Sequence, residues 1–179
     1  NYNGTDTFTY KANDGTADSN TSTVTVTIVA VNDAPVASNI SFSTNEDTAA
    51  TVSLAGTDVD GDDITYTIVS QSTNGSVTLN SNGVTFTYTP DSNYNGTDTF
   101  TYNANDGDED SNTATVTVTV DAVNDLPTTD DQTASTDEDT AVDITLESTD
   151  VDTGDTITYS IVSDVSNGST SLSGSTVTY

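Results

Sequence analysis

The chain repeats itself at an offset of 92 residues, and this repeat is the feature that most constrains its fold. The segment 1–10 returns unchanged as 93–102. Three shorter motifs recur at the same offset: Val31-Asn32-Asp33, Glu46-Asp47-Thr48 and Asp58-Val59-Asp60. One residue is then inserted near Thr153, after which the offset becomes 93. A period of this length is typical of an array of repeated structural modules.

The repeat divides the chain into three parts: the end of one repeat (1–34), one complete repeat (35–126) and the first part of another (127–179). A fragment as short as the first part, with one hairpin's worth of strands, is not expected to fold alone. Tyr179 aligns near Phe86, so the two partial repeats together would make one module that lacks about six residues. The chain is therefore either a window on a longer array, or neighbouring copies complete one another's modules.

The complete repeat has the alternation of apolar and polar residues that is typical of β-strands. Ile64, Tyr66 and Ile68 alternate with threonine, and threonine suits the solvent-facing side of an antiparallel sheet. Seven strands are predicted: 36–44, 49–55, 63–70, 76–79, 84–89, one carrying Phe100, Tyr102 and Ala104, and one carrying Val116, Val118 and Val120. The predicted fold is all-β, with tandem immunoglobulin-like modules of seven strands each.

The chain carries 29 acidic residues, 25 of them Asp, against the single basic residue Lys11, which gives a net charge of −28. This charge makes nucleic acids and anionic membrane surfaces poor partners, because binding them depends on Lys and Arg. No apolar run approaches the roughly 20 residues that a membrane span needs. Such a charge is also typical of disorder, but the strand periodicity favours a folded chain stabilised by cations.

The densest acidic cluster is Asp58-Val59-Asp60-Gly61-Asp62-Asp63, in the loop after the second predicted strand. Carboxylates at alternate positions, with a glycine for a sharp turn, can converge on one Ca²⁺ ion, which takes 6–8 oxygen ligands. An EF-hand is rejected because the Glu at position twelve and the flanking helices are missing. The alternative is a solvated acidic turn. Further acidic and amide side chains lie in other predicted loops or near strand ends: Glu46, Asp98, Asp106, Asp121, Asn124 and Asp125.

Several of these motifs resemble those of cadherins. Asp121 with Asn124-Asp125-Leu126-Pro127 resembles the cadherin linker Asp-x-Asn-Asp-Asn-x-Pro, and Asp58-x-Asp60 resembles the cadherin Asp-x-Asp pair. The segment from Phe100 to Gly107 resembles a strand and loop that carry another calcium ligand, and Glu46 stands where the first-strand Glu would. The whole chain is similar to the cadherin-like repeats, about 95 residues long, of large bacterial surface adhesins and secreted RTX-type proteins.

The resemblance implies two calcium sites at the junctions between modules. One would combine Glu46, Asp98, Asp121, Asn124, Asp125, Asp150 and Asp152. The earlier one would combine Asn32, Asp33, Asp58, Asp60 and Asp106, with Asp62 in the same cluster. The chain departs from the pattern at Val29, which replaces the leading Asp of the linker, and at Ala34 and Leu126, which replace its last Asn. Fewer ions per junction than in animal cadherins are therefore expected.

An enzyme is not expected, because the acidic residues recur in every repeat and neither His nor Cys is present. The predicted function is a calcium-rigidified extension repeat of an extracellular adhesin or surface fibre. Its partners would be neighbouring repeats of the same chain or identical chains, with carbohydrate or cell-surface ligands bound through other domains. The alternative is a carbohydrate- or surface-binding β-sandwich, in which Tyr2, Tyr94 and Tyr102 would contact the ligand.

Overall fold

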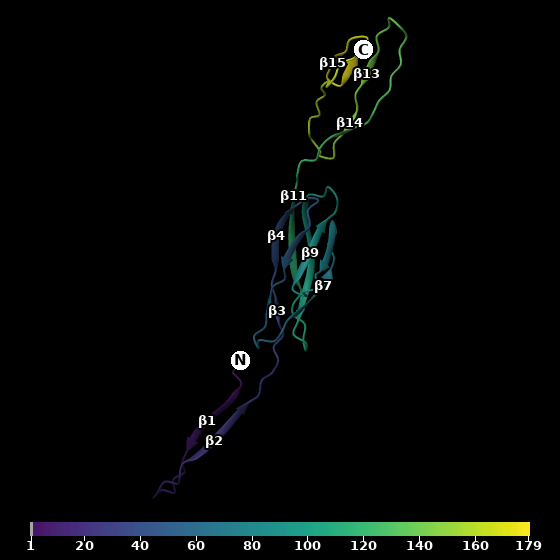
Figure 1. Cartoon of the computed structure of the whole chain (residues 1–179). Helices are drawn as coiled ribbons and strands as arrows, with labels where there is room; N and C mark the ends of the chain where they lie inside the picture. Colours follow the sequence, from purple (N-terminus) through teal and green to yellow (C-terminus); the bar gives the residue numbers. More distant parts are fainter. Residues whose placement is uncertain (1) are drawn as a thin grey trace. The chain divides into compact units, whose positions relative to one another are not determined.

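The structure is a computed structural model that describes residues 2–179, so Asn1 of the recurring segment lies outside the described residues. The chain forms two compact units, Asn1–Ala122 and Val123–Tyr179 (Figure 1). The first unit holds the first partial repeat and the complete repeat without its last four residues, 123–126. In the described part of the chain, no helix is long and apolar enough to cross a membrane.

The complete repeat is a β-sandwich of a four-stranded and a three-stranded sheet, with one small two-stranded sheet beside them. The four-stranded sheet has the order β4-β11-β10-β7, in which β4 and β11 are parallel and the other pairs antiparallel. Its strands are β4 (Ile40–Asn45), β7 (Thr65–Ser70), β10 (Gly96–Asn105) and β11 (Ala114–Asp121). The antiparallel three-stranded sheet β5-β9-β8 contains β5 (Ala50–Ser53), β8 (Gly75–Leu79) and β9 (Thr85–Pro90).

The core lies between the two sheets and is made by alternate residues of each strand. On β10 and β11, Phe100, Tyr102, Val116 and Val118 are at most 1 % exposed, whereas the threonines between them are exposed or half-buried. The Phe100 ring meets Phe86 of β9 edge to face at a centroid distance of 4.8 Å. This packing confirms the predicted immunoglobulin-like sandwich.

One segment predicted as a single strand changes sheets midway, and another ends before a short strand of a different sheet. Residues 36–44 divide into β3 (Val36–Ala37) and β4, and residues 49–55 end in β5 before β6 (Gly56–Thr57). The division arises because β3 pairs with β6, whereas β4 pairs with β11 and β5 with β9. The buried Tyr102 hydroxyl holds this corner, because its single proton is shared between the carbonyl oxygens of Ser38 and Ala55, which both lie within hydrogen-bond distance. Tyr102 is therefore a core residue and does not face a carbohydrate ligand.

The first partial repeat is a hairpin of β1 (Gly4–Tyr10) and β2 (Ser22–Ile28). Its register is that of β10 and β11, since Phe8 pairs with Val24 as Phe100 pairs with Val116. The same strand pair thus forms in both repeats, but the hairpin has no second sheet packed on it among the described residues.

The unit Val123–Tyr179 contains counterparts of two sheets of the complete repeat, its small two-stranded sheet and its three-stranded sheet. Its strands are β12 (Thr128–Thr129), β13 (Asp143–Thr145), β14 (Ser148–Thr149), β15 (Ser171–Ser173) and β16 (Thr176–Thr178). They pair as β12-β14 and β13-β16-β15, which matches β3-β6 and β5-β9-β8. The counterparts of β4 and β7 are not strands in this described unit. No described residue of this unit corresponds to β10 or β11, the partners of β7 and β4 in the complete repeat.

The structure corrects the predicted alignment of Tyr179, which takes the position of Tyr88 and not that of Phe86. Leu172 pairs with Val177 as Leu79 pairs with Phe86, because the β15–β16 turn is two residues shorter than the β8–β9 turn. Each tyrosine lies against a glycine in the same way: a Cβ atom on Gly168 or on Gly75 would lie 2.9 Å from the Tyr179 or Tyr88 ring. The two partial repeats together therefore lack only the counterparts of residues 89–92.

Candidate metal site

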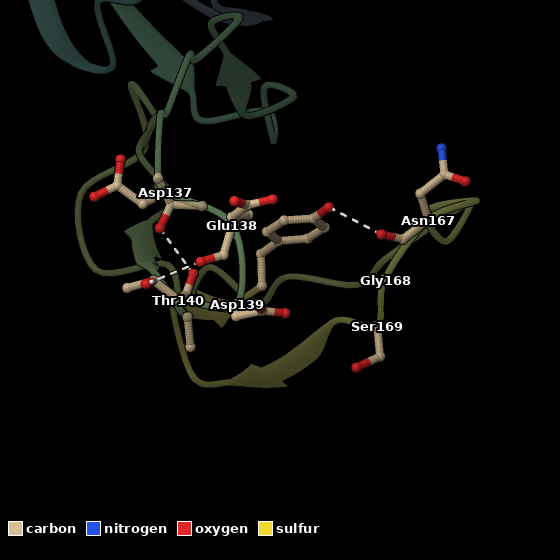
Figure 2. Close-up of a pocket in the computed structure, with 10 residues that line it drawn as sticks. Asp137, Glu138, Asp139, Thr140, Asn167, Gly168 and Ser169 are labelled. Atoms are coloured by element: carbon tan, nitrogen blue, oxygen red, sulfur yellow. Dashed lines mark hydrogen bonds between the residues drawn. The ribbon is translucent and has the colours of Figure 1, made fainter.

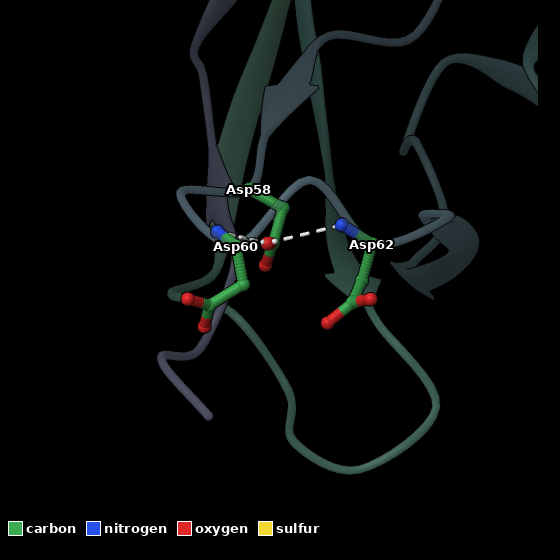
Figure 3. Close-up of side chains that lie close together, drawn as sticks. All are labelled: Asp58, Asp60 and Asp62. Atoms are coloured by element: carbon green, nitrogen blue, oxygen red, sulfur yellow. Dashed lines mark hydrogen bonds between the residues drawn. The ribbon is translucent and has the colours of Figure 1, made fainter. Parts of the chain in front are cut away.

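The acidic loop 58–63 is folded around one carboxylate, that of Asp58 (Figure 3). Its Oδ1 atom accepts hydrogen bonds from the backbone N–H groups of Asp60 at 2.8 Å, Gly61 at 2.9 Å and Asp62 at 3.3 Å. Gly61 has a φ of 86°, a conformation in which a side chain would be strained. The alternating Asp-x-Asp-Gly-Asp pattern thus produces a turn that brings three carboxylates together.

The three carboxylates have the spacing of ligands around a single ion. One oxygen from each of Asp58, Asp60 and Asp62 lies within 4.8 Å of the others. Two oxygens on opposite sides of a Ca²⁺ ion, each about 2.4 Å from it, would be about 4.8 Å apart. The Oδ2 atom of Asp58 is buried and accepts no hydrogen bond from any residue that the structure describes. A buried carboxylate oxygen without a donor is costly unless a cation or water contacts it.

The segment 31–35, the connector at the start of the complete module, is hydrogen-bonded to this loop and to a second acidic loop that contains Asp106. The Asp33 backbone N–H donates a 2.8 Å hydrogen bond to Asp60 Oδ2, and the Asn32 side-chain amide donates a 3.0 Å hydrogen bond to Asp106 Oδ2. All five residues predicted for the earlier junction, and Asp62, are therefore brought to one end of the module. Their role as metal ligands stays a prediction.

The unit Val123–Tyr179 repeats part of this arrangement on its own. The Asp125 backbone N–H donates to Asp152 Oδ2 at 2.6 Å, and the Asp152 N–H donates to Asp150 Oδ1 at 3.0 Å. The same two hydrogen bonds occur 92 residues earlier, where the Asp33 N–H donates to Asp60 and the Asp60 N–H donates to Asp58. Asn124 differs from Asn32, because its amide donates to the adjacent Asp125 carbonyl at 2.6 Å. The contact between connector and Asp-x-Asp loop is thus a repeated feature of the chain.

The electrostatics of the earlier site favour a cation. The pKa of Asp62 is raised, first by loss of solvation and then by the negative charges of Asp58 and Asp60 and those of Asp106 and Asp108. The pKa of Asp106 is lowered by the Glu109 backbone N–H, the Asn32 amide and the Asp108 N–H. Asp106 therefore stays ionised, whereas the loss of solvation and the neighbouring negative charges oppose the ionisation of Asp62. A divalent cation bound there would offset these negative charges.

The residues predicted for the later junction are divided between the two units. Glu46, Asp98 and Asp121 belong to the first, where the Glu46 N–H donates to the Asp121 carbonyl at 2.9 Å. Asn124, Asp125, Asp150 and Asp152 belong to the second. That these residues combine into one metal site stays a prediction.

Asp98 has a structural environment within the complete module. It is 3 % exposed, and its carboxylate accepts hydrogen bonds from the backbone N–H groups of Thr73, Asn74 and Thr99 and from the Tyr88 hydroxyl, at 2.8–3.1 Å. Four donors compensate a buried carboxylate without a metal ion. The role of Asp98 as a metal ligand stays a prediction.

The ligand sets predicted from the sequence leave out two residues of the acidic loops, Asp108 and Asp14. Asp108 contributes to the field at Asp62, and Asp14 is the counterpart of Asp106 in the first hairpin. Asp14 Oδ1 accepts the N–H groups of Thr16 and Ala17 at 2.8 Å, as Asp106 Oδ1 accepts those of Asp108 and Glu109. The offset of 92 was the signal for Asp14, because Asn13-Asp14-Gly15 recurs as Asn105-Asp106-Gly107.

The complete module matches a known family. Residues 32–119 match the family model described as a bacterial Ig domain. These residues form the immunoglobulin-like sandwich described above, and in this segment the chain is similar to bacterial Ig domains. The cadherin-like repeats that the sequence resembles are not singled out by this match. No match to the chain is found among curated proteins.

Among solved structures, the chain is similar to an endo-fucoidan hydrolase of glycoside hydrolase family 107, with 22 % identity and a TM-score of 0.42 over 68 % of this chain and 19 % of that one. It is also similar to domains 4 and 5 of the S-layer protein SbsC, with 20 % identity and a TM-score of 0.34 over 64 % and 58 % of the two chains. The chain spans about a fifth of the length of that hydrolase. At TM-scores this low, neither similarity bears on function.

Proposed function

We propose that the chain is a structural extension segment of a bacterial extracellular protein, in which Ca²⁺ bound at the start of each module fixes the connector to the module. The match to a bacterial immunoglobulin-like domain supports a structural, non-catalytic role. The observation that carries the calcium part is the buried Oδ2 of Asp58, which has no donor among the described residues and lies beside Asp60 and Asp62.

The proposed ion is bound by oxygens of Asp58, Asp60 and Asp62, with Asp106 the fourth carboxylate nearby. Ca²⁺ suits this set, because it takes carboxylate oxygens in flexible geometry, whereas Mg²⁺ demands a near-ideal octahedron and keeps several waters. Asp33 and Asn32 donate hydrogen bonds to two of these carboxylates. Binding an ion there would therefore hold the connector as well as the loop.

The expected affinity is that of extracellular calcium modules, with a Kd on the order of 10⁻⁴–10⁻³ M. A ligand that binds only the folded state stabilises it by about 2.7 kcal/mol at one hundred times its Kd. Such a site would be occupied in calcium-rich external media and largely empty in a cytosol. The module would thus become more stable and its connector stiffer after export.

Calcium binding is tested by thermal unfolding and by calorimetric titration with Ca²⁺, with Mg²⁺ and after chelation. We expect calcium to raise the unfolding temperature of the wild-type chain, and the double variant Asp58→Asn/Asp60→Asn to need a higher calcium concentration for the same rise. The matched control is Asp130→Asn/Asp131→Asn, which removes the same charge from another loop. If the first variant responded to calcium like the control, the ligand assignment would be wrong.

Stiffening is tested separately by small-angle X-ray scattering on the same chain with calcium and with chelator. A longer and narrower distribution of dimensions is expected with calcium, and its loss in the Asp58→Asn/Asp60→Asn variant. If calcium bound without changing the distribution, the metal site would be supported and the mechanical role would be refuted.

A further inference from the structure

We propose that the complete module bears tensile load along the chain, and that its parallel strand pair β4–β11 is the element that resists this load. The two strands lie side by side (Figure 1), in a register that runs from Ile40 beside Val116 to Asn45 beside Asp121. A load-bearing role goes beyond that of an extension segment. It needs no bound ion, so it stands or falls independently of the calcium site.

The chain enters and leaves the module at opposite ends of this strand pair. The connector 31–35 leads through β3 into the start of β4, and the end of β11 leads into the next connector, 121–127. Because the strands are parallel, the start of β4 lies beside the start of β11 and away from its end. A pull on the two connectors therefore slides the strands along each other. Their hydrogen bonds are evenly spaced between the strands, so sliding strains all of them at once, whereas peeling would strain one at a time.

A side chain continues this ladder where the chain crosses between sheets. Continued backwards, the register places Ser38 opposite Ala114, where a parallel ladder would bond the Ser38 carbonyl oxygen to the Thr115 N–H. That carbonyl oxygen instead lies within hydrogen-bond distance of the Tyr102 hydroxyl. The Asn39 side-chain carbonyl accepts the Thr115 N–H at 2.8 Å. A side-chain oxygen thus replaces the backbone acceptor at the crossing.

The Asn112 side chain ties the two segments one step further. Its Oδ1 atom accepts the Ala37 N–H at 3.1 Å, and its Nδ2 atom donates to the Ala37 carbonyl oxygen at 3.0 Å. Ala37 is buried, so water competes little for these bonds. At the opposite end the Glu46 N–H donates to the Asp121 carbonyl oxygen at 2.9 Å. The tie to β11 and the residues before it therefore extends beyond both ends of β4.

A tight loop holds the far end of β4. The Thr44 hydroxyl donates to the Thr48 carbonyl oxygen at 2.9 Å, which closes the loop between β4 and β5. The same loop forms in the second unit, where the Thr136 hydroxyl donates to the Thr140 carbonyl oxygen at 2.7 Å (Figure 2). β5 follows this loop and pairs with β9 of the other sheet. Withdrawing β4 along β11 would therefore also pull on the second sheet.

Force spectroscopy on the 179-residue chain, held by handles at its two ends and kept in chelator, tests the proposal. Unfolding of the complete module is recognised by its length, because residues 36–121 extend to about 300 Å. Moving the first handle to the exposed position 49, through Ala49→Cys, places both handles at the same end of the strand pair. The same fold is then peeled, and we expect a clearly lower unfolding force, with about 250 Å released. Equal forces in the two geometries would overturn the proposal.

Asn112→Ala tests the side-chain tie, since it removes both hydrogen bonds to Ala37. The matched control is Asn80→Ala, which also removes two side-chain hydrogen bonds, with Thr85 and Thr87, but near the turn between β8 and β9, outside the path of the load. At a given force, Asn112→Ala should raise the unfolding rate by roughly tenfold or more, and Asn80→Ala should leave it unchanged. Equal rates in the two variants, at the same loss of stability in urea, would refute the tie.

A pair of proline variants tests the backbone ladder. The Glu46 N–H points to β11, and N–H groups of successive residues point to opposite edges of a strand, so the Thr44 N–H points to β11 and the Ser43 N–H away from it. Thr44→Pro therefore removes a ladder bond, whereas Ser43→Pro removes none. Thr44→Val controls for the lost hydroxyl. Thr44→Pro alone should lower the unfolding force, and an equal fall in Ser43→Pro would contradict the proposed load path.

Discussion

Replacing Asp98 with Asn tests whether the Asp98 carboxylate has a structural role or is a calcium ligand. The side chain is 3 % exposed and accepts four hydrogen bonds, two on each oxygen. In Asp98→Asn one oxygen becomes an NH₂ group, which cannot accept from the donors that faced it. If the amide nitrogen takes the place of Oδ2, the Asn74 N–H loses its acceptor and the Tyr88 hydroxyl must reverse its role.

Each buried donor that loses its acceptor costs about 1–3 kcal/mol, and bonds to a charged acceptor lie at the upper end. We therefore expect Asp98→Asn to lower the free energy of unfolding of the complete module by about 2–5 kcal/mol. For a module of this size, 2 kcal/mol corresponds to a fall in Tm of roughly 8–16 °C. Thermal unfolding followed by circular dichroism would measure it, with calcium and with chelator.

The structural role requires the same loss of stability in both conditions. A loss that appears only with calcium would show that Asp98 is a metal ligand and that its hydrogen bonds contribute little. The matched control is Asp6→Asn, the same change in the hairpin β1–β2. It should leave the unfolding of the complete module unchanged, because Asp6 is exposed in the lone chain.

Two further changes test the core. Phe100→Ala should destabilise the complete module by about 3–5 kcal/mol, because it removes a buried ring that packs on Phe86. The counterpart change Phe8→Ala, at an exposed position, should alter the stability of the chain by less than about 0.5 kcal/mol. Urea unfolding would measure both changes. Burial and, after it, the hydrogen bond to Asp98 raise the pKa of Tyr88 above its usual value of about 10. The unfolded state therefore loses the Tyr88 proton at a lower pH than the folded state, and the stability of the module should fall as pH rises above about 10. Tyr88→Phe should make that fall shallower in urea midpoints measured between neutral and alkaline pH, although Tyr66 and Tyr102, whose pKa values are also raised, should leave part of it.

Much of the fold follows from local sequence pattern. The alternation on β10 and β11 predicts which residues are buried, because successive side chains of a strand point to opposite faces. The exchange of partners at Ser38 and Asn39 was not predicted, because nothing in the local pattern distinguishes a strand that stays in one sheet from one that crosses to another. The misplacement of Tyr179 has a similar cause, since a turn shortened by two residues is visible only in the strand register.

The candidate metal site was predictable in part. The Asp-x-Asp-Gly-Asp spacing indicates a turn with converging carboxylates, and the structure brings Asp58, Asp60 and Asp62 together. The sequence treats Asp98 as equivalent to the loop acids, because burial and the donors around a carboxylate depend on residues far along the chain. The Tyr88 hydroxyl and the Thr73 and Asn74 N–H groups reach Asp98 only after β8, β9 and β10 have packed.

The sequence by itself determined the period of the repeat, the strand-forming segments and the all-β class, because periodicity and composition are local properties of the chain. The tertiary structure decided which equivalent residues are core and which are exposed. Phe8 and Phe100 stand in identical ten-residue segments, yet only Phe100 is buried. The difference arises because burial depends on a second sheet, which β5, β8 and β9 supply to Phe100 and which none of the described residues supplies to Phe8.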